Sequence, residues 1–303
     1  MGRKVRFIPP NSLVEVTCRT VQGRFLLQPS EEFDKIFVGI LARAQNFHSV
    51  RIHGFVALSN HYHLLISPQT AWQLARFMQY VNTNVSKEAG RLSKWDGPIF
   101  QGRYHAIVVS DESRAQVGRL RYLLAHGVKE GLVARACEWP GPHCARSLSA
   151  GEPAAGVWID RSAMAKARNP EALRVPGNFI RDYTLQLAPL PCWSHLSPET
   201  RRDRIREMLE AIEKEAARGA QLSGAHPLGP AVIEAQDPKD SPLSSKRSPA
   251  PWIHAASRSA RRRFVEAYAI FLESFRSAAR EAVSSVSMSL FPEGCFPPPL
   301  SPG

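Results

Sequence analysis

The first half of the chain alternates between two hydrophobic periods. Leu13–Thr20 alternates apolar and polar side chains, which predicts a strand, because successive side chains of a strand point to opposite faces. Apolar residues recur at helical spacing between residues 33 and 47, behind an N-cap at Ser30, so a first helix is predicted there. Two further apolar runs, 50–58 and 61–67, are separated by two turn-forming residues and predict a hairpin.

The same periods continue to about residue 127. A second helix is predicted behind Thr70, a fourth strand over 104–109, and a third helix capped by Ser110 or Asp111. The resulting order, strand-helix-strand-strand-helix-strand and a final helix, is that of a ferredoxin-like fold. We therefore expect an α+β fold, an antiparallel sheet with helices packed on it, although a fold this common does not identify a function.

Beyond residue 139 the pattern weakens, and composition divides the rest of the chain. The α+β domain is expected over 1–150, followed by a mainly α-helical C-terminal extension. The extension is expected to hold a helical part over 151–218, a loosely attached linker rich in Pro, Gly and Ser over 219–251, and a basic amphipathic helix with a Pro-rich tail over 252–303.

Composition narrows the compartment. No run of 18 apolar residues occurs, so no transmembrane helix is expected, and the expected location is the cytoplasm, at the nucleoid if the chain binds DNA. The five cysteines are scattered and no Cys-x-x-Cys pair exists, which argues against both a disulfide framework and structural zinc.

The charge of the chain is strongly basic. The formal net charge is +12, and residues 1–150 carry 19 Lys and Arg against 10 Asp and Glu. A balance this basic favours a polyanionic partner, with nucleic acid first and an anionic membrane surface second. Charge alone leaves open the alternative of an ordinary basic globular protein.

The sharpest chemical feature is His61-Tyr62-His63 in the third predicted strand. Side chains two apart on a strand share a face, so the two imidazoles project together and can hold one metal ion, while Tyr62 points into the core. The alternative for the pair is two exposed surface histidines without a ligand.

Tyr122 and His126 form a second pair, four residues apart on the third predicted helix. That spacing brings both to one helical face, where a hydroxyl and a third nitrogen could meet the ion of the histidine pair. The alternative is a half-buried Tyr122 and a His126 that interacts with the helix dipole. Together the two pairs suit transesterification at phosphorus, in which a phosphotyrosine bond conserves the phosphodiester energy. The sequence has no Gly-x-x-x-x-Gly-Lys-Ser/Thr nucleotide site.

At these residues the chain resembles the single-tyrosine HUH (His-hydrophobe-His) transposases, and within them the REP-associated tyrosine transposases. The resemblance covers about residues 5–150 and is carried by four segments in the family's order: Val16–Leu27 (VTCRTVQGRFLL), Leu58–Ile66 (LSNHYHLLI), Ile99–Tyr104 (IFQGRY) and Arg121–Val133 (RYLLAHGVKEGLV). His-x-His alone is not specific, whereas the ordered combination is.

The resemblance implies roles for four residues. Tyr122 matches the nucleophile, His61 and His63 match the metal pair, and His126 stands where the family has its third metal ligand. It also implies Mg²⁺ or Mn²⁺, a 5′-phosphotyrosine link, and single-stranded or hairpin DNA as partner. The chain departs from the family at two places, with His126 for the usual Asn and Gly127 for the usual Pro. Histidine is the softer ligand, which would shift the metal preference toward Mn²⁺.

The function expected from these residues is that of a DNA transposase, a single-strand endonuclease and strand transferase that nicks and rejoins hairpin-containing DNA. Two alternatives stay open: a non-catalytic hairpin-binding or single-strand-binding protein descended from a transposase, and a phosphoester hydrolase that uses an activated water. Tyr104 is a rival nucleophile, and Tyr80 is expected to be structural or to contact DNA. The DNA target and the choice between monomer and homodimer stay open.

Candidate DNA contacts surround the expected site. Single strands bind in cationic grooves with aromatic platforms, and the residues of those types are Arg103, Arg114, Arg119, Arg121, Trp95 and Phe100. The alternative for each is ordinary packing, and Arg119 and Arg121 are expected to lie off the helical face of Tyr122. Arg258–Arg263, at the start of the last helix, either grip a hairpin or form a solvated face behind an aromatic packing stripe.

Overall fold

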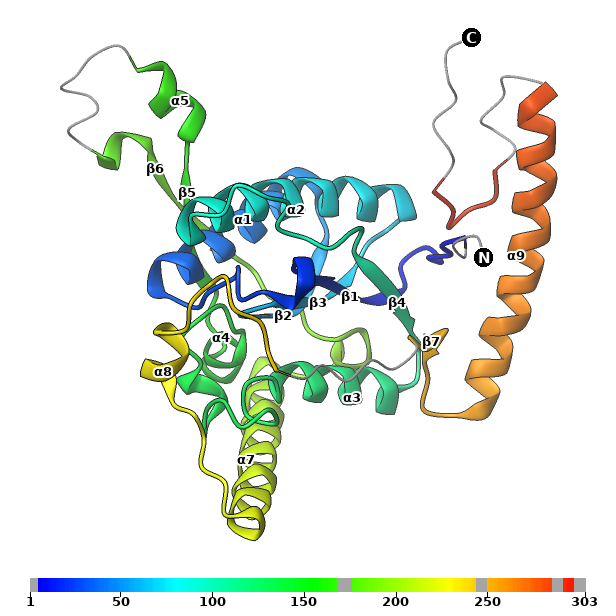
Figure 1. Cartoon of the computed structure of the whole chain (residues 1–303). Helices are drawn as coiled ribbons and strands as arrows, with labels where there is room; N and C mark the ends of the chain where they lie inside the picture. The colour runs from blue at the N-terminus through cyan, green and yellow to red at the C-terminus, as the bar shows by residue number, and fades with distance from the viewer. Residues whose placement is uncertain (1–4, 168–175, 244–249, 285–290, 297–303) are drawn as a thin grey trace.

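The computed structural model describes residues 5–167, 176–243, 250–284 and 291–296. A five-stranded sheet with the order β2-β3-β1-β4-β7 lies at its centre (Figure 1). Its strands are β1 (Leu13–Arg19), β2 (Arg51–Leu58), β3 (His61–Ser67), β4 (His105–Val109) and β7 (Ile253–His254). The first four are antiparallel, as the sequence predicts, whereas β7 pairs parallel to β4 and makes the sheet mixed.

Helices cover both faces of this sheet. α1 (Glu31–His48) and α2 (Ala71–Ser93) lie on one face, and α3 (Ser113–Leu124) lies on the other (Figure 1). Ser30 and Thr70 cap α1 and α2, each accepting a backbone N–H three residues on, as predicted. The predicted cap of α3 is wrong, because Glu112 is the N-cap residue and Ser110 Oγ donates to its carboxylate at 2.7 Å instead.

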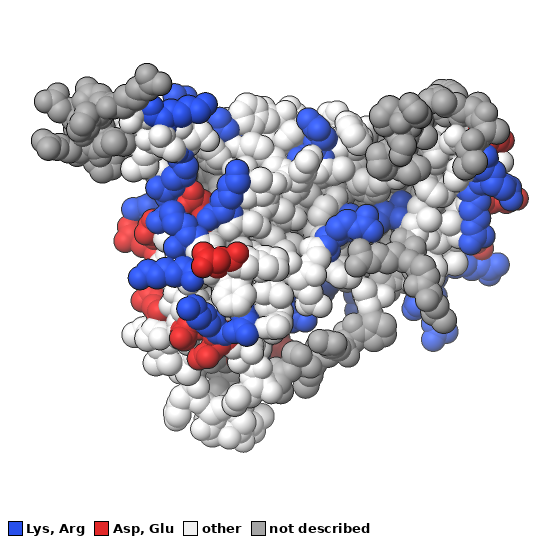
Figure 2. All heavy atoms as spheres, turned by 45° about the horizontal axis from the view of Figure 1, so that its top comes forward, with Lys and Arg blue, Asp and Glu red and all other residues white. Residues whose placement is uncertain are grey.

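The basic side chains do not gather into one band on the visible surface. Figure 2, tilted so that the top of Figure 1 comes forward, shows Lys and Arg on both flanks, with acidic side chains among those on the left. The net charge of +12 is therefore spread over several elements.

The segment after α3 contains strands that the sequence analysis does not predict. It continues through η2 (Ala136–Glu138), α4 (Ala145–Ala150), β5 (Ala154–Ile159), α5 (Arg161–Lys166), η3 (Pro176–Phe179), β6 (Ile180–Leu185) and η4 (Pro191–Trp193). The helical expectation for 151–218 is therefore wrong over β5 and β6, which form an antiparallel pair packed on α1. Both strands are short and partly exposed, so they lack the strong alternation by which a strand is recognised.

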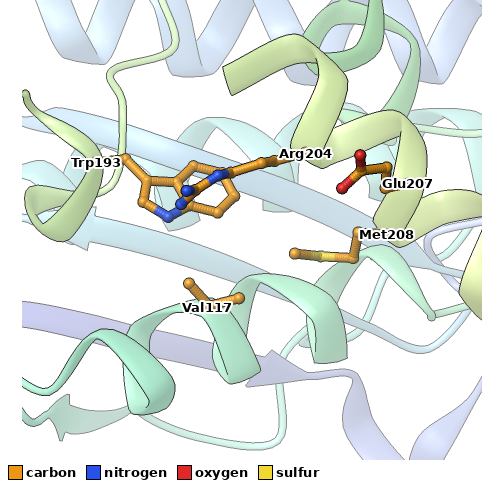
Figure 3. Close-up of a pocket in the computed structure, with 5 residues that line it drawn as sticks. All are labelled: Val117, Trp193, Arg204, Glu207 and Met208. Atoms are coloured by element: carbon orange, nitrogen blue, oxygen red, sulfur yellow. The ribbon is translucent and has the colours of Figure 1, made fainter. Parts of the chain in front are cut away.

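A long helix, α7 (Pro198–Ser223), packs against α3. It begins at Ser197, whose side chain caps it, and it buries Ile205, Leu209 and Ile212. A hollow of about 330 Å³ lies between α3, η4 and α7, and Figure 3 shows its lining of Val117, Trp193, Arg204, Glu207 and Met208. None of these residues belongs to the histidine cluster predicted from the sequence, so the hollow is a feature of the packing between helices.

The linker expected to be loose is attached where the structure describes it. The short helix α8 (Pro230–Glu234) lies within the linker. The linker backbone forms hydrogen bonds to the domain both before and after α8. Leu228 N donates to Gly131 O at 3.0 Å, and Phe25 N donates to Asp240 O at 2.9 Å. Composition predicted disorder over 219–251, but the described part satisfies its backbone polar groups against the domain.

The last helix packs through its aromatic stripe. α9 (Arg258–Ser284) carries Tyr268 and Phe271, which form a small cluster with Phe7 of the N-terminal segment. The rings of Phe7 and Phe271 stack with 4.4 Å between centroids. The aromatic stripe of α9 therefore packs against the N-terminal segment. None of the helices in the described part of the chain is long and apolar enough to span a bilayer.

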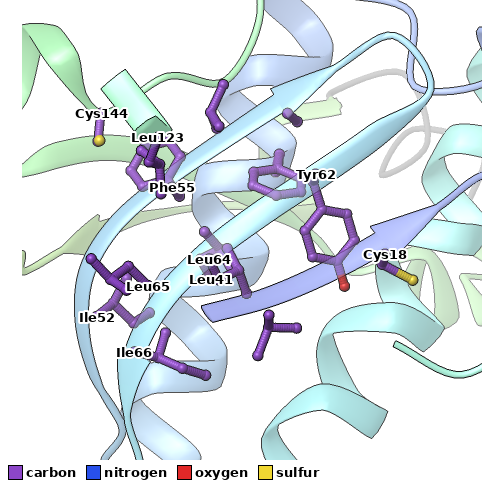
Figure 4. Close-up of a cluster of buried hydrophobic side chains, with 14 of the residues drawn as sticks. Cys18, Leu41, Ile52, Phe55, Tyr62, Leu64, Leu65, Ile66, Leu123 and Cys144 are labelled. Atoms are coloured by element: carbon purple, nitrogen blue, oxygen red, sulfur yellow. The ribbon is translucent and has the colours of Figure 1, made fainter. Parts of the chain in front are cut away.

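Both faces of the sheet are covered, so alternate side chains of β3 are buried on opposite sides of the sheet. Tyr62, Leu64 and Ile66 are fully buried among the apolar residues of Figure 4. The Tyr62 ring meets Phe37 of α1 edge-on at 5.6 Å, and its hydroxyl donates to Asn82 Oδ1. Since Tyr62 points into this core, its neighbours on β3 point to the opposite face, toward α3.

Candidate active site

The three predicted histidines converge on the α3 side of the sheet. His61 and His63 project from β3 with 5.1 Å between their ring centroids. The His126 ring lies 4.5 Å from that of His63 and 5.8 Å from that of His61. One ring nitrogen from each residue lies within 4.8 Å of the other two, which is a spacing that one metal ion can bridge.

In each of the three imidazoles, Nδ1 is the ring nitrogen that faces a hydrogen-bond acceptor of the protein. The acceptors facing the three Nδ1 atoms are Asn60 Oδ1 at 2.6 Å for His61, Glu15 Oε1 and Thr17 Oγ1, both at 3.0 Å, for His63, and Leu123 O at 3.2 Å for His126. An Nδ1–H donated to these oxygens leaves the lone pair on Nε2, which is the arrangement of metal-binding histidines.

Burial favours the neutral form of two of these rings, His61 and His126. Removal from water lowers the pKa of His61 and of His126 well below its ordinary value, and the neighbouring His63 lowers both further. A neutral imidazole keeps the lone pair that a metal requires. The donor set therefore fits a divalent metal, and three nitrogens suit Mn²⁺ or a softer ion better than Mg²⁺.

Tyr122 reaches the cluster from the last turn of α3. Its ring stands edge-on to His126 at 4.7 Å and to His63 at 5.9 Å, and 37% of the residue is exposed. α3 ends at Leu124, earlier than predicted, and His126 N bonds to Leu123 O at 3.2 Å in a tighter turn, but the rings of Tyr122 and His126 still meet. Burial, followed by the charge of Glu15, raises the pKa of the Tyr122 hydroxyl.

Two cations contact the Tyr122 ring. The guanidinium carbon of Arg119 lies 4.2 Å from the ring centroid, and Lys129 Nζ lies 3.3 Å from it. The expectation that Arg119 lies off this helical face is wrong, because residues three apart on a helix are neighbours. Both cations stand where they could attract a phosphate next to the hydroxyl.

Lys129 also contacts the histidine cluster. Its Nζ lies 3.2 Å from His126 Nε2 and donates to the lone pair that a metal would use. Burial lowers the pKa of Lys129. A metal ion and Lys129 therefore compete for one lone pair, so Lys129 has to move when a cation binds. The sequence analysis missed this residue, because its contact depends on the turn after α3.

Gly127 explains one departure from the family pattern. Its φ is +85°, a value closed to proline, whose ring holds φ near −65°. A Cβ here would also lie 3.2 Å from the Trp139 ring. The chain therefore turns at residue 127 in a way that the usual Pro could not follow.

Of the other predicted DNA contacts, some are exposed and some are paired or packed inside the protein. Arg121 pairs with Glu215 of α7 and points away from Tyr122, while Arg103 and Arg114 are exposed. Trp95 is half-buried with Arg24 over its ring at 5.1 Å. Phe100 packs edge-on against Tyr62 at 5.7 Å, so most of its ring belongs to the core.

The rival tyrosines lack the ligand cluster. Tyr104 is buried, which raises the pKa of its hydroxyl, and Arg6 stacks on its ring at 4.3 Å. Tyr80 accepts a hydrogen bond from Arg43 at 2.7 Å within an aromatic cluster on the α1 and α2 side of the sheet. Among the tyrosines described, Tyr122 is thus the one whose ring contacts the histidine cluster, at His63 and His126.

Comparison with known proteins gives a limited result. No protein-family model and no curated protein match this chain. A solved structure of a REP-associated tyrosine transposase bound to a REP hairpin covers 50% of this chain and 86% of its own, at 15% identity and a TM-score of 0.42. A candidate transposase from Deinococcus radiodurans R1 covers 40% of this chain and 93% of its own, at 16% identity and a TM-score of 0.27. Both are described as transposases, like the family that the sequence resembles, but likenesses this weak carry no functional assignment.

Proposed function

We propose that this chain is a metal-dependent single-stranded DNA transesterase that nicks and rejoins hairpin-containing DNA through Tyr122. One observation carries the proposal. Three histidine nitrogens lie within 4.8 Å of one another, and the Tyr122 ring lies 4.7 Å from the His126 ring. A hydroxyl beside a three-nitrogen metal site suits phosphoryl transfer to tyrosine, because a bound metal can orient the phosphate and stabilise its charge.

In this mechanism His61, His63 and His126 would hold Mn²⁺ or Mg²⁺. The bound cation would neutralise the charge that grows on a phosphate oxygen in the transition state. Arg119, whose guanidinium lies over the Tyr122 ring, attracts the phosphate to the hydroxyl. The hydroxyl oxygen attacks phosphorus and loses its proton to solvent, while the bond to the 3′ oxygen breaks and that oxygen takes up a proton from solvent and leaves as a 3′-hydroxyl. Attack by a 3′-hydroxyl on the 5′-phosphotyrosine reverses these steps and rejoins the strand.

The substrate class rests on charge and on the resemblance seen in the sequence. A net charge of +12 favours a polyanion, and the half-exposed Tyr122 is open to a flexible strand. The hairpin comes from the resemblance to REP-associated tyrosine transposases. A protein with this activity would work in the cytoplasm, at the nucleoid.

A labelled hairpin substrate tests the proposal. The protein is incubated with the single-stranded hairpin and Mn²⁺, and covalent adducts are separated on a denaturing gel. The wild-type protein is expected to give an adduct, and Tyr122→Phe, which lacks the attacking oxygen, is expected to give none. Tyr104→Phe is the matched control, because it removes a hydroxyl outside the histidine cluster, and it should keep the adduct.

Two other results would identify the competing functions. A wild-type protein that binds the hairpin but never forms an adduct is a DNA-binding protein. Cleavage that persists in Tyr122→Phe belongs to a hydrolase that uses water as nucleophile. Either result rejects the tyrosine transesterase.

A further inference from the structure

A buried carboxylate behind the histidine cluster is the feature of this site that the proposed mechanism does not use. Glu15 lies on β1, beside β3, where Thr17 is paired with His63. Its side chain is 7% exposed and points to the same face of the sheet as the histidines. A carboxylate this deep is costly unless it is paired, so its partners indicate what it does.

Glu15 has three partners: one contacts Oε1 and the other two contact Oε2. Oε1 accepts from His63 Nδ1 at 3.0 Å, while Oε2 accepts from Arg119 at 3.1 Å and lies 2.7 Å from His254 Nε2. Burial by itself would raise the pKa of Glu15, but the hydrogen bonds of His254 and His63 and the charge of Arg119 bring it well below its ordinary value.

The bond to His63 concerns the metal site. A carboxylate that accepts Nδ1–H fixes the ring orientation and the tautomer of a ligating histidine, and makes Nε2 a stronger ligand. Of the three histidines in the cluster, His63 is the one with a carboxylate as its acceptor, since His61 and His126 face an amide and a backbone oxygen.

The bond to Arg119 concerns the nucleophile. Arg119 lies on α3, and its guanidinium is held between the Glu15 carboxylate and the Tyr122 ring, 4.2 Å from the ring centroid. One carboxylate therefore positions both a predicted metal ligand and the cation that contacts the nucleophile.

The third contact of Glu15 involves the far end of the chain, because His254 Nε2 lies 2.7 Å from Glu15 Oε2 as an ion-pair contact. His254 lies on β7, whose residues pair with Val108 and Val109 of β4. Its own carbonyl accepts from Ser110 N at 2.9 Å, and the carboxylate of Glu112 accepts from Ala256 N at 2.8 Å. The start of the C-terminal helical segment is thus fixed to the edge of the sheet, with the His254 ring against Glu15.

We propose that Glu15 and His254 are positioning residues of this site, and that docking of the segment around β7 completes it. His254 holds Glu15, and Glu15 holds His63 and Arg119 in place for the metal and for Tyr122. This inference rests on the proposed metal site, and it adds a dependence on a segment outside the α+β domain. The site is complete when β7 is docked and is weakened when β7 is released.

Direct Mn²⁺ binding, measured without DNA by electron paramagnetic resonance of the free ion, tests the positioning role. Glu15→Ala is expected to weaken Mn²⁺ binding by about tenfold to a hundredfold, the range found for such outer partners of metal ligands. His254→Ala should weaken it by a smaller factor. His254→Gln, whose amide can still donate to Glu15, should restore most of the affinity. His226→Ala removes an exposed histidine and is the control, with wild-type affinity.

The outcomes separate this inference from the proposed function. If His254→Ala is folded by circular dichroism and binds Mn²⁺ as the wild type does, the positioning role of His254 is rejected, whatever the hairpin assay gives. If the wild type binds no Mn²⁺, the positioning role is rejected together with the metal site. If Mn²⁺ binding falls as expected but no adduct forms, the inference stands and the transesterase is rejected. Should Glu15→Ala fail to fold, the pair His254→Ala and His254→Gln still decides.

Discussion

His53 and His63 lie on neighbouring strands, and their ring nitrogens have different partners. At His53 both nitrogens are used inside the protein: Nδ1 donates to Pro189 O at 2.8 Å, and Nε2 accepts from Ser67 Oγ at 2.8 Å. At His63 the bond to Glu15 uses Nδ1 and leaves Nε2 for a ligand. The residue type alone does not separate a structural histidine from a ligating one, whereas an account of both nitrogens does.

Because His53 is buried with a lowered pKa, we expect the free energy of unfolding to fall at acid pH. Burial lowers the pKa of His53 to about 4, from an ordinary value of 6.5. A lowered pKa in the folded state means that the stabilisation is complete above pH 6.5 and is lost as the pH falls through 4. The size of the shift corresponds to roughly 3 kcal/mol of unfolding free energy. Urea denaturation at several values between pH 7 and pH 4 measures it.

A His53→Gln variant isolates this contribution from the other groups that titrate in the same range. Buried His143, whose pKa burial also lowers to about 4, adds a slope of its own in both proteins. The variant should therefore show a flatter dependence of unfolding free energy on pH than the wild type. Parallel curves for the two proteins would show that His53 is not the titrating group.

At the scale of elements, the β5–β6 pair depends on one close backbone contact with α1. Gly39 of α1 faces Val157 of β5, and a Cβ on Gly39 would lie 2.0 Å from the Val157 carbonyl oxygen. Gly156 approaches the same helix, and its Cβ would lie 2.2 Å from Gly39 N. Two glycines thus permit a strand pair to lie directly on a helix, which hydrophobic periodicity does not reveal.

Gly39→Ala is expected to destabilise the protein by about 3 kcal/mol or to release the β5–β6 pair, because the obstructing atoms are backbone. Gly118→Ala is the matched control, a glycine inside α3 with nothing within 4 Å of its Cβ position. That control should gain about 0.5–1 kcal/mol from helix propensity. Thermal and urea denaturation of both variants measure the difference. Equal stability of the two variants would contradict the contact.

At the scale of the whole molecule, charge makes DNA binding dependent on salt. The net charge is +12, and basic side chains lie on both flanks in Figure 2. A protein that neutralises about five phosphates of a single strand loses roughly a hundredfold in affinity between about 50 and about 200 mM salt. We expect a loss of this order for a hairpin substrate, measured by fluorescence anisotropy with Tyr122→Phe to prevent covalent capture. An affinity that is independent of salt would exclude a phosphate-dominated interface.

The sequence by itself determined the order of elements over the first half of the chain and the identity of the convergent residues. Local geometry is the reason. Residues two apart on a strand share a face, and residues four apart on a helix share one, so His61 could be paired with His63, and Tyr122 with His126, without knowing the topology of the sheet. The resemblance to the transposases then joined the two pairs into one expected site. Apolar period and caps likewise placed α1, α2 and the stripe of α9.

Only the tertiary structure decided which residues stand behind that group. Glu15 meets His63 through the pairing of β1 with β3, and His254 meets Glu15 from more than 200 positions along the chain. The tertiary structure was also needed to place the short strands β5, β6 and β7. It was needed as well to show that the linker backbone bonds to the domain. Such contacts depend on strand register and on the docking of distant segments, which are set by the packing of the whole chain and leave no periodic trace in the sequence.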